Sequence, residues 1–290
     1  MPPAAKLTTP LYIKKPTKNC FLVGLIFILL KTGINILLTV VLALEPIWLQ
    51  ARTYSIHPGT FDKQSLEMPG YCSDDILLKY SGFIVSYDSE HLIPKWVAYE
   101  LTSEEVDGTV SRSGSFGMDL NYKGKQAMRE DYSYSGWDKG HMAPAADMKW
   151  SQEAMWESFY LTNVCPQNHE LNGGDWLALE KKARELAKRY GNVYVICGPI
   201  IGVNKNGTIG ANKVTVPDKF FKAFLVETDG VFHAIAFIME NEGFHRKLSS
   251  YALTVNQLED ISGIDFFVNL PDMIEESVEA EADLNIFLLY

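Results

Sequence analysis

One histidine and one asparagine, 31 positions apart, have the residue types and spacing best suited to chemistry. His141 lies in Asp138-Lys139-Gly140-His141-Met142-Ala143-Pro144, and Asn172 lies in Leu171-Asn172-Gly173-Gly174-Asp175-Trp176. A neutral imidazole takes a proton from water near neutral pH, because its unperturbed pKa is about 6.5. A carboxamide oxygen is a hard ligand of the kind that Mg²⁺ accepts while it keeps most of its own waters. Together they predict metal-assisted hydrolysis of a phosphodiester.

Each of the two residues also has a purely structural explanation. An asparagine at the start of a helix often serves only as the N-cap, whose side chain accepts a backbone N–H. A single histidine in a loop is often an ordinary surface residue. Gly140 favours a site because it lets the backbone approach a substrate closely. The combination of the two motifs, in this order, favours chemistry over either structural explanation.

The elements that must position these residues indicate an α+β chain. Short runs rich in β-branched and aromatic residues predict strands at 83–87, 96–101, 193–197, 220–226 and 231–239. Apolar residues at helical spacing predict a long amphipathic helix from Trp176 to Tyr190, with Asn172 just ahead of its first turn. Ser151 is expected to cap a short helix, and a capping box at 254–257 to start a late one. We expect a mixed or antiparallel sheet with flanking helices.

The composition excludes disorder and weakens one functional class. With 47% hydrophobic and 12% aromatic residues, the chain can bury a proper core. Its formal net charge of −10 argues against a protein that coats nucleic acid, which should be basic. An enzyme that must release its products needs only a local basic cleft. The acidity therefore counts more against a binding protein than against an enzyme.

Residues 20–44 form an apolar stretch in which Lys31 is the one charged residue. At a rise of about 1.5 Å per residue, such a stretch suffices to cross a hydrocarbon layer of roughly 30 Å, although Lys31 costs about 2.5–3.5 kcal/mol. Lysines lie upstream and no acidic residue comes before Glu45, which favours a cytoplasmic N-terminus. We expect residues 1–44 to be an export segment, either an uncleaved membrane anchor or a cleaved signal peptide. The catalytic domain would then lie outside the cytoplasm, membrane-anchored, secreted or periplasmic.

The rest of the chain divides into three parts. Residues 45–75 contain three prolines and two glycines without a sustained period, so we expect a linker or lead-in there. A single catalytic domain is expected over residues 76–275. Residues 276–290 are expected to form an acidic C-terminal tail.

The two motifs resemble those of the DNA/RNA non-specific endonuclease family, which includes the mitochondrial endonuclease G type. Residues 138–144 are similar to its Asp-Arg-Gly-His-x-x-Pro signature. Its Asn-x-x-Pro-Gln, Asn-x-Gly-x-Trp and Leu-Glu elements have counterparts at 163–167, 172–176 and 179–180. Residues 195–199, 212–217 and 263–267 resemble its later landmarks, so the resemblance extends over residues 80–275. It implies a ββα-metal (His-Me finger) active-site motif.

The resemblance also implies roles for individual residues. His141 would be the general base and Asn172 the direct metal ligand. Glu180, eight residues on and so on the same face of the predicted helix, would hold a metal-bound water; its structural alternative is a surface carboxylate. Asn163 would help to order the site, and Asp138 would support the motif loop.

Two basic residues would handle the phosphate. Arg112 looks like the family arginine that engages the scissile phosphate, although a lone loop arginine is usually surface charge. Lys139 stands where the family signature has arginine. Lysine keeps the charge but loses the planar bidentate fork. Stabilisation of the transition state would therefore be weaker or would depend more on Arg112 and the metal.

The leading hypothesis is a metal-dependent endonuclease that cuts DNA and RNA through contacts to phosphate and sugar. Its metal would be Mg²⁺, with Mn²⁺ or another divalent cation as an alternative, and a homodimer is left open. One alternative is a phosphodiesterase of the same fold that acts on small nucleotides, which a closed pocket able to stack a single base would favour. Another is a membrane-anchored nucleic-acid-binding protein with a dead site. The presence of both His141 and Asn172 counts against the latter.

Overall fold

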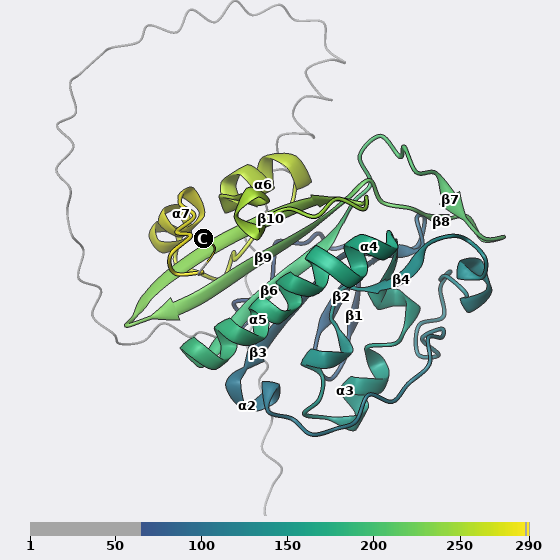
Figure 1. Cartoon of the computed structure of the whole chain (residues 1–290), viewed down its shortest axis with the longest axis horizontal. Helices are drawn as coiled ribbons and strands as arrows, with labels where there is room; N and C mark the ends of the chain where they lie inside the picture. Colours follow the sequence, from purple (N-terminus) through teal and green to yellow (C-terminus); the bar gives the residue numbers. More distant parts are fainter. Residues whose placement is uncertain (1–64, 288, 290) are drawn as a thin grey trace, which may run out of the picture. The chain divides into compact units, whose positions relative to one another are not determined.

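A seven-stranded antiparallel sheet forms the centre of the computed structural model, which describes residues 65–287 and 289 (Figure 1). The strands lie in the order β1-β2-β3-β6-β9-β10-β11, and each pair of neighbours is antiparallel. Their bounds are β1 Ile76–Lys79, β2 Ile84–Asp88, β3 Ile93–Thr102, β6 Asn192–Ile200, β9 Lys219–Thr228, β10 Val231–Glu240 and β11 Ala252–Leu253.

Two small ribbons, six α-helices and several short 3-10 turns complete the described part of the chain. The ribbons pair β4 Asp138–His141 with β5 Val164–Gln167, and β7 Thr208–Ile209 with β8 Val214–Thr215. The helices are α2 Ser103–Val106, α3 Gln152–Glu157, α4 His169–Leu171, α5 Leu177–Tyr190, α6 Val255–Ser262 and α7 Asp272–Ala280. A π-helical turn, Asn172–Trp176, joins α4 to α5.

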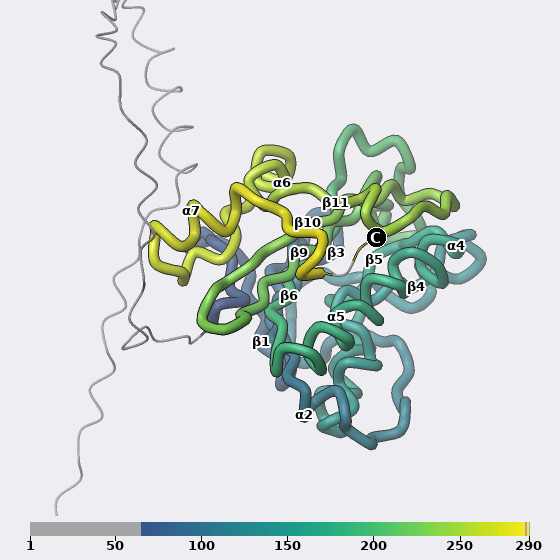
Figure 2. The backbone as a smooth tube through the Cα atoms, turned by 60° about the vertical axis from the view of Figure 1, so that its left-hand side comes forward, coloured from purple at the N-terminus to yellow at the C-terminus, as the bar shows by residue number. Residues whose placement is uncertain are grey.

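The sheet is covered on both faces, as Figure 2 shows. Helix α5 packs on one face, and α6 and α7 pack on the other. Strand β9 lies between the two layers, so its alternate side chains enter different cores. Phe220, Phe224 and Val226 join the core under α5, whereas Phe221, Ala223 and Leu225 join the core under α6 and α7. Between residues 220 and 226 the strand is therefore apolar on both sides, except for Lys222 on the α5 side.

The structure confirms the expected α+β fold and most of its elements. Ser151 caps α3, and the Thr254–Gln257 capping box starts α6, which ends at Gly263 in the left-handed conformation. Helix α5 ends at Gly191, whose φ of 92° a side chain would disfavour. Helix α7 crosses residue 275, and Phe287 is fully buried. The division drawn between residues 275 and 276 stays a prediction.

The expected export segment, residues 1–44, lies outside the described residues, and so does most of the expected linker. Over the part of the chain that the structure describes, no helix is long and apolar enough to cross a membrane.

Candidate active site

The β4–β5 ribbon fixes the position of His141. Strand β4 pairs His141 with Val164 and Gly140 with Cys165 on β5. A Cβ on Gly140 would lie 2.6 Å from Cβ of Gln167, so a side chain at this position would push the two strands apart. The imidazole is 8% exposed and packs between two aromatic rings, with centroid distances of 5.0 Å to Phe116 and 5.2 Å to Phe159. His141 is therefore a largely buried residue.

Hydrogen bonds hold the backbone around His141 in place. The indole Nε1 of Trp176 donates to the carbonyl oxygen of His141 at 3.1 Å. Asn163 is fully buried, and its side chain accepts from Ala143 N–H at 2.9 Å and donates to the carbonyls of Ala143 and Ser158. Both polar atoms of the Asn163 amide are therefore used in hydrogen bonds to the backbone. Asn163 can order the site, but it does not line the pocket.

Burial makes the His141 imidazole hard to protonate. It lowers the pKa of His141 to about 3, and the positive charge of Arg112 acts in the same direction. The ring is therefore neutral near pH 7. Its Nε2 atom is buried and has no hydrogen-bond partner among the residues that the structure describes. A neutral ring with an uncommitted nitrogen is the state that a general base needs.

Six of the seven predicted site residues line one pocket of about 450 Å³. The shared pocket contains Arg112, Asp138, Lys139, His141, Asn172 and Glu180. Strand β4 provides Asp138, Lys139 and His141. The segment from the π turn into α5 provides Asn172 and Glu180. Asn163 is the one predicted residue that lies outside the lining.

The structure excludes an N-capping role for Asn172. Asn168 caps α4, because its side chain accepts from the backbone N–H groups of Glu170 and Leu171. Asn172 itself has helical φ and ψ of −57° and −49°, and its Nδ2 donates to Asp138 Oδ2 at 2.9 Å. This bond orients the amide and leaves its Oδ1 without a hydrogen bond within the described part of the chain. The uncommitted oxygen is the kind of atom that binds a hard cation.

The sequence spacing suggested that Asn172 and Glu180 lie on one regular helix, but they do not. The π turn intervenes, and Gly174 within it has non-helical φ and ψ of −110° and −106°. Both side chains nevertheless line the same pocket. They reach it from the two sides of the kink at Gly174, so their shared position does not come from the face of a single helix.

Glu180 is 8% exposed, which rules out a surface carboxylate. Burial raises its pKa to about 7, while the positive charge of Lys222 works against that rise. No described residue gives Glu180 a hydrogen bond. The side chain is thus a buried carboxyl group whose oxygens remain uncommitted.

The sequence analysis did not predict Lys222, whose positive charge acts on this carboxyl group. Lys222 is fully buried on β9, and its Nζ lies 4.3 Å from the centroid of the Trp176 ring. Its Nζ has no hydrogen-bond partner among the described residues. Nearby, Arg184 forms an ion pair with the fully buried Asp147. The one available signal was a single charged residue inside the apolar run of β9.

The two basic residues predicted to bind phosphate lie against aromatic rings. The Arg112 guanidinium lies 5.2 Å from the Phe159 ring centroid, and Lys139 Nζ lies 5.2 Å from that of Tyr132. Burial lowers the pKa of Lys139, and neighbouring Arg129 adds to the effect. Both side chains line the pocket. The structure thus brings two cationic side chains to the same cavity as His141.

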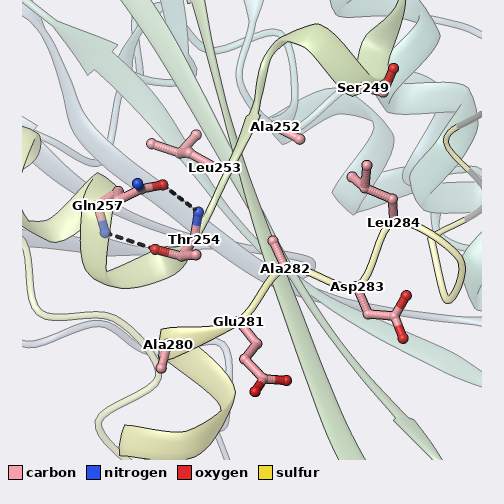
Figure 3. A pocket seen from close by; sticks show the side chains of 10 residues that line it. All are labelled: Ser249, Ala252, Leu253, Thr254, Gln257, Ala280, Glu281, Ala282, Asp283 and Leu284. Carbon is pink, nitrogen blue, oxygen red and sulfur yellow. Dashed lines mark hydrogen bonds between the residues drawn. The ribbon is translucent and has the colours of Figure 1, made fainter.

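A second groove, of about 580 Å³, runs between the start of α6 and the C-terminal segment (Figure 3). Thr254 and Gln257 satisfy each other's backbone N–H groups in it, as the dashed lines show. Its carboxylates, Glu281 and Asp283, come from the C-terminal segment. None of the predicted site residues lines this groove, so we assign it no chemistry.

The model of the DNA/RNA non-specific endonuclease family matches residues 62–273. The chain belongs to this family. Over 204 residues it is 38% identical to mitochondrial nuclease EXOG of Danio rerio, a match that covers 65% of this chain and 60% of the relative. Over 264 residues it is 30% identical to the mitochondrial nuclease of Saccharomyces cerevisiae, with 82% and 78% covered. A crystal structure of the EndoG/EndoGI complex, on the mechanism of EndoG inhibition, contains a similar fold, with TM-score 0.66, 31% identity and 71% and 90% of the two chains covered.

The chain spans 57–62% of the length of the four vertebrate EXOG relatives that it matches. The activity, substrates and partners of these whole proteins are therefore proposals for this chain.

The expected export of the catalytic domain is wrong, because the relatives are mitochondrial nucleases. The evidence for export was a lysine-bearing, acid-free and apolar N-terminus. Mitochondrial targeting segments are also basic and poor in acidic residues. The charge pattern therefore did not distinguish the two destinations.

Members of this family depend on a divalent metal ion. The pocket fits such an ion, because the uncommitted oxygens of Asn172 and Glu180 line it together. Among the described residues, those of the pocket included, no three His, Cys, Asp or Glu side chains are grouped to hold a metal.

Proposed function

We propose that this protein is a metal-dependent endonuclease that hydrolyses phosphodiester bonds in DNA and RNA without much preference for the sugar. One observation carries the proposal. A neutral His141 with an uncommitted Nε2 shares a pocket with the uncommitted oxygens of Asn172 and Glu180. Family membership supports the same chemistry.

His141 acts as the general base and accepts a proton from the attacking water. Its low pKa keeps the ring neutral at the start of the reaction, and its aromatic neighbours exclude other water. Asp138 orients the Asn172 amide, and Asn163 holds the loop after His141 through Ala143. These two residues position the site without touching the reacting atoms.

Arg112 and Lys139 bind the substrate phosphate. Two positive charges at one cavity attract the phosphodiester, although the protein is acidic as a whole. Contacts to phosphate and sugar carry little sequence information, which fits activity on both DNA and RNA.

Asn172 would bind the metal ion through Oδ1, and Glu180 would hold one of its waters. When bound, the ion neutralises the negative charge that develops on the phosphate. We propose Mg²⁺, because it binds few protein oxygens and keeps most of its own waters. Mn²⁺ or another divalent cation is the alternative.

The relatives' names support a mitochondrial location for this chain. Membrane attachment through residues 20–44, a homodimer and the division into 1–44, 45–75, 76–275 and 276–290 stay predictions.

The proposal is tested by incubating the purified full chain with plasmid DNA and with RNA in Mg²⁺. We expect both substrates to be degraded, EDTA to stop the reaction, and a His141→Ala protein to be inactive. Cutting that continues undiminished in EDTA would exclude the metal. Full activity of His141→Ala would exclude the mechanism.

A further inference from the structure

The loop after β10 exposes an aromatic and three basic side chains in sequence, Phe244-His245-Arg246-Lys247. Phe244 is 66% exposed, and the next three residues are exposed as well. Neither Arg246 nor Lys247 forms an ion pair with any residue of the described chain. In a protein of net charge −10, this loop is a local concentration of unpaired positive charge beside a solvent-facing ring.

Asp175 ties the middle of this 244–247 loop to the π turn that carries Asn172. The Asp175 carboxylate accepts from Arg246 N–H at 3.0 Å and from the Tyr251 hydroxyl at 2.6 Å. It also contacts His245 Nδ1 at 3.3 Å. Asp175 itself is 8% exposed, although its partner His245 is exposed. The loop is therefore held in a defined place.

Asn241 ties the start of the loop to the other side of the same turn. Its Oδ1 accepts from Asn168 N–H at 2.7 Å, and its Nδ2 donates to the carbonyl of Pro166 at 3.2 Å. Asn241 is 1% exposed. Figure 2 shows the segment after β10 beside α4. The 244–247 loop is thus anchored to the chain both before and after Asn172.

Direct packing brings the loop within two residues of Asn172. The His245 ring fills the space that a side chain on Gly174 would need, because a Cβ there would lie 2.3 Å from His245 Cε1. A strand of nucleic acid bound at the pocket would therefore pass close to this loop.

We propose that the 244–247 loop is a second contact for single-stranded nucleic acid, in which Arg246 and Lys247 bind phosphates and Phe244 stacks on an unpaired base. The inference rests on the proposed function, since it places the loop beside the reacting phosphate. Proteins bind single strands by combining a positive surface that follows the backbone with exposed aromatic rings. The loop offers both on a rigid support.

The test measures binding of a labelled single-stranded oligonucleotide to the full chain by fluorescence anisotropy. EDTA is present, so that the oligonucleotide stays intact. The Arg246→Ala/Lys247→Ala protein is compared with a matched Lys188→Ala/Arg189→Ala control. The control removes the same two charge types from the last turn of α5, roughly 18 Å along the helix from its start.

We expect the loop variant to bind several-fold more weakly than the control. We also expect the slope of log affinity against log salt to fall by about 1.4, because each single-strand phosphate contact contributes about 0.7. In Mg²⁺ its KM rises while its kcat stays within about twofold, since neither residue belongs to the catalytic machinery. Affinity and salt slope equal to those of the control would overturn the phosphate contacts.

Phe244 is tested with Phe244→Ala and Phe244→Trp. Loss of the ring weakens single-strand binding at least about fivefold, whereas tryptophan retains it. Equal weakening on duplex and single strand would overturn the stacking contact. Thermal melting checks that each protein is folded; if the double alanine variant melts early, Arg246→Gln/Lys247→Gln replaces it. Loop-dependent binding by a wild-type chain that hydrolyses nothing would refute the proposed function and leave this inference standing.

Discussion

The two sides of the pocket around His141 differ in how they treat a buried ionisable group. On the β4–β5 side, aromatic rings enclose the imidazole and keep it neutral. On the α5 side, Glu180 is equally buried, but a fully buried lysine lies near it. Burial favours the neutral form of both groups. On the α5 side the charge of Lys222 opposes this effect, whereas on the β4–β5 side the charge of Arg112 adds to it.

The difference shows how one small cavity serves two chemical needs. A base must begin without its proton, and an apolar wall achieves this for a histidine. A carboxyl group that holds a metal-bound water is most useful as an anion, and burial alone would work against that. Lys222 opposes the effect of burial on Glu180. Substitutions on either side test whether these two electrostatic environments determine activity.

Removal of the base should have the largest effect. A His141→Ala protein is expected to lose about 10²–10⁴-fold in kcat, the range for general base catalysis. The melting temperature and oligonucleotide affinity should change little, because the β4 backbone is held through Trp176 and Asn163. Single-turnover cleavage in Mg²⁺ measures the loss. A decrease below tenfold would show that another group takes the proton.

Loss of the buried lysine should have the second largest effect. Lys222→Met keeps the length of the side chain but removes the positive charge, and we expect activity to fall about 10–100-fold, as for groups that support a metal site. Stability should change little, because methionine keeps the apolar length of the side chain and Lys222 Nζ makes no hydrogen bond to any described residue. A merely structural role would instead lower the melting temperature and leave the activity per folded molecule unchanged.

Lys222→Arg is the matched control for this experiment. It retains the charge and should recover part of the activity of Lys222→Met. The concentration of Mg²⁺ needed for half-maximal activity should rise in Lys222→Met more than in the arginine variant. Equal requirements in both would show that the charge does not act on the metal-binding side.

The two sides should also respond to pH in opposite directions. The pKa of His141 is lowered to about 3, so the native state loses stability as pH falls from about 6.5 toward 3, where the unfolded chain binds the additional proton. The pKa of Glu180 is raised to about 7, so stability is lost as pH rises from about 4.5 toward 7. Urea unfolding of the metal-free protein across this range measures both.

Two neutral substitutions separate these contributions. His141→Gln should reduce the loss of stability as pH falls from about 6.5 toward 3, and Glu180→Gln should reduce the loss as pH rises from about 4.5 toward 7. Unchanged pH profiles in both variants would contradict the opposite behaviour of the two sides.

The smallest effect is expected at Lys139. Lys139→Arg should raise kcat/KM by less than about tenfold, because a planar fork can bind phosphate through two hydrogen bonds. Arg112→Lys is the reciprocal change and should lower kcat/KM. A decrease in activity for Lys139→Arg would show that the aromatic surroundings, with Tyr132 5.2 Å from Nζ, fit only the lysine.

Sequence motifs predicted the residues that line the pocket, but they did not predict Lys222 or the ion pair between Asp147 and Arg184. Six predicted residues meet there because the motifs contain both the residue types and the local turns that present them. Lys222 and the Asp147–Arg184 pair come from segments that periodicity can only describe as strand, loop or helix. Their proximity depends on how the sheet, the loop and α5 pack, which a linear pattern does not contain.

At Asn172 and Glu180, hydrogen bonds and packing decide between a functional and a purely structural role. At Asn172 an N-cap was a reasonable alternative, and only the hydrogen bonds of Asn168 removed it. For Glu180 the neighbouring lysines indicated a surface position, whereas packing against the sheet buries it. The sheet and the main helices followed from alternation and capping signals, because those depend on local sequence.

The break at Gly174 makes the chain intolerant of insertions and deletions between Asn172 and Glu180. Eight residues of regular helix would rotate the second side chain about 80° past two full turns. The non-helical φ and ψ of Gly174 change the course of the chain between the two residues, and both side chains line one pocket. A residue added or removed there would rotate Asn172 relative to Glu180 by about 100°. Natural variation in length should therefore be rare between these two positions.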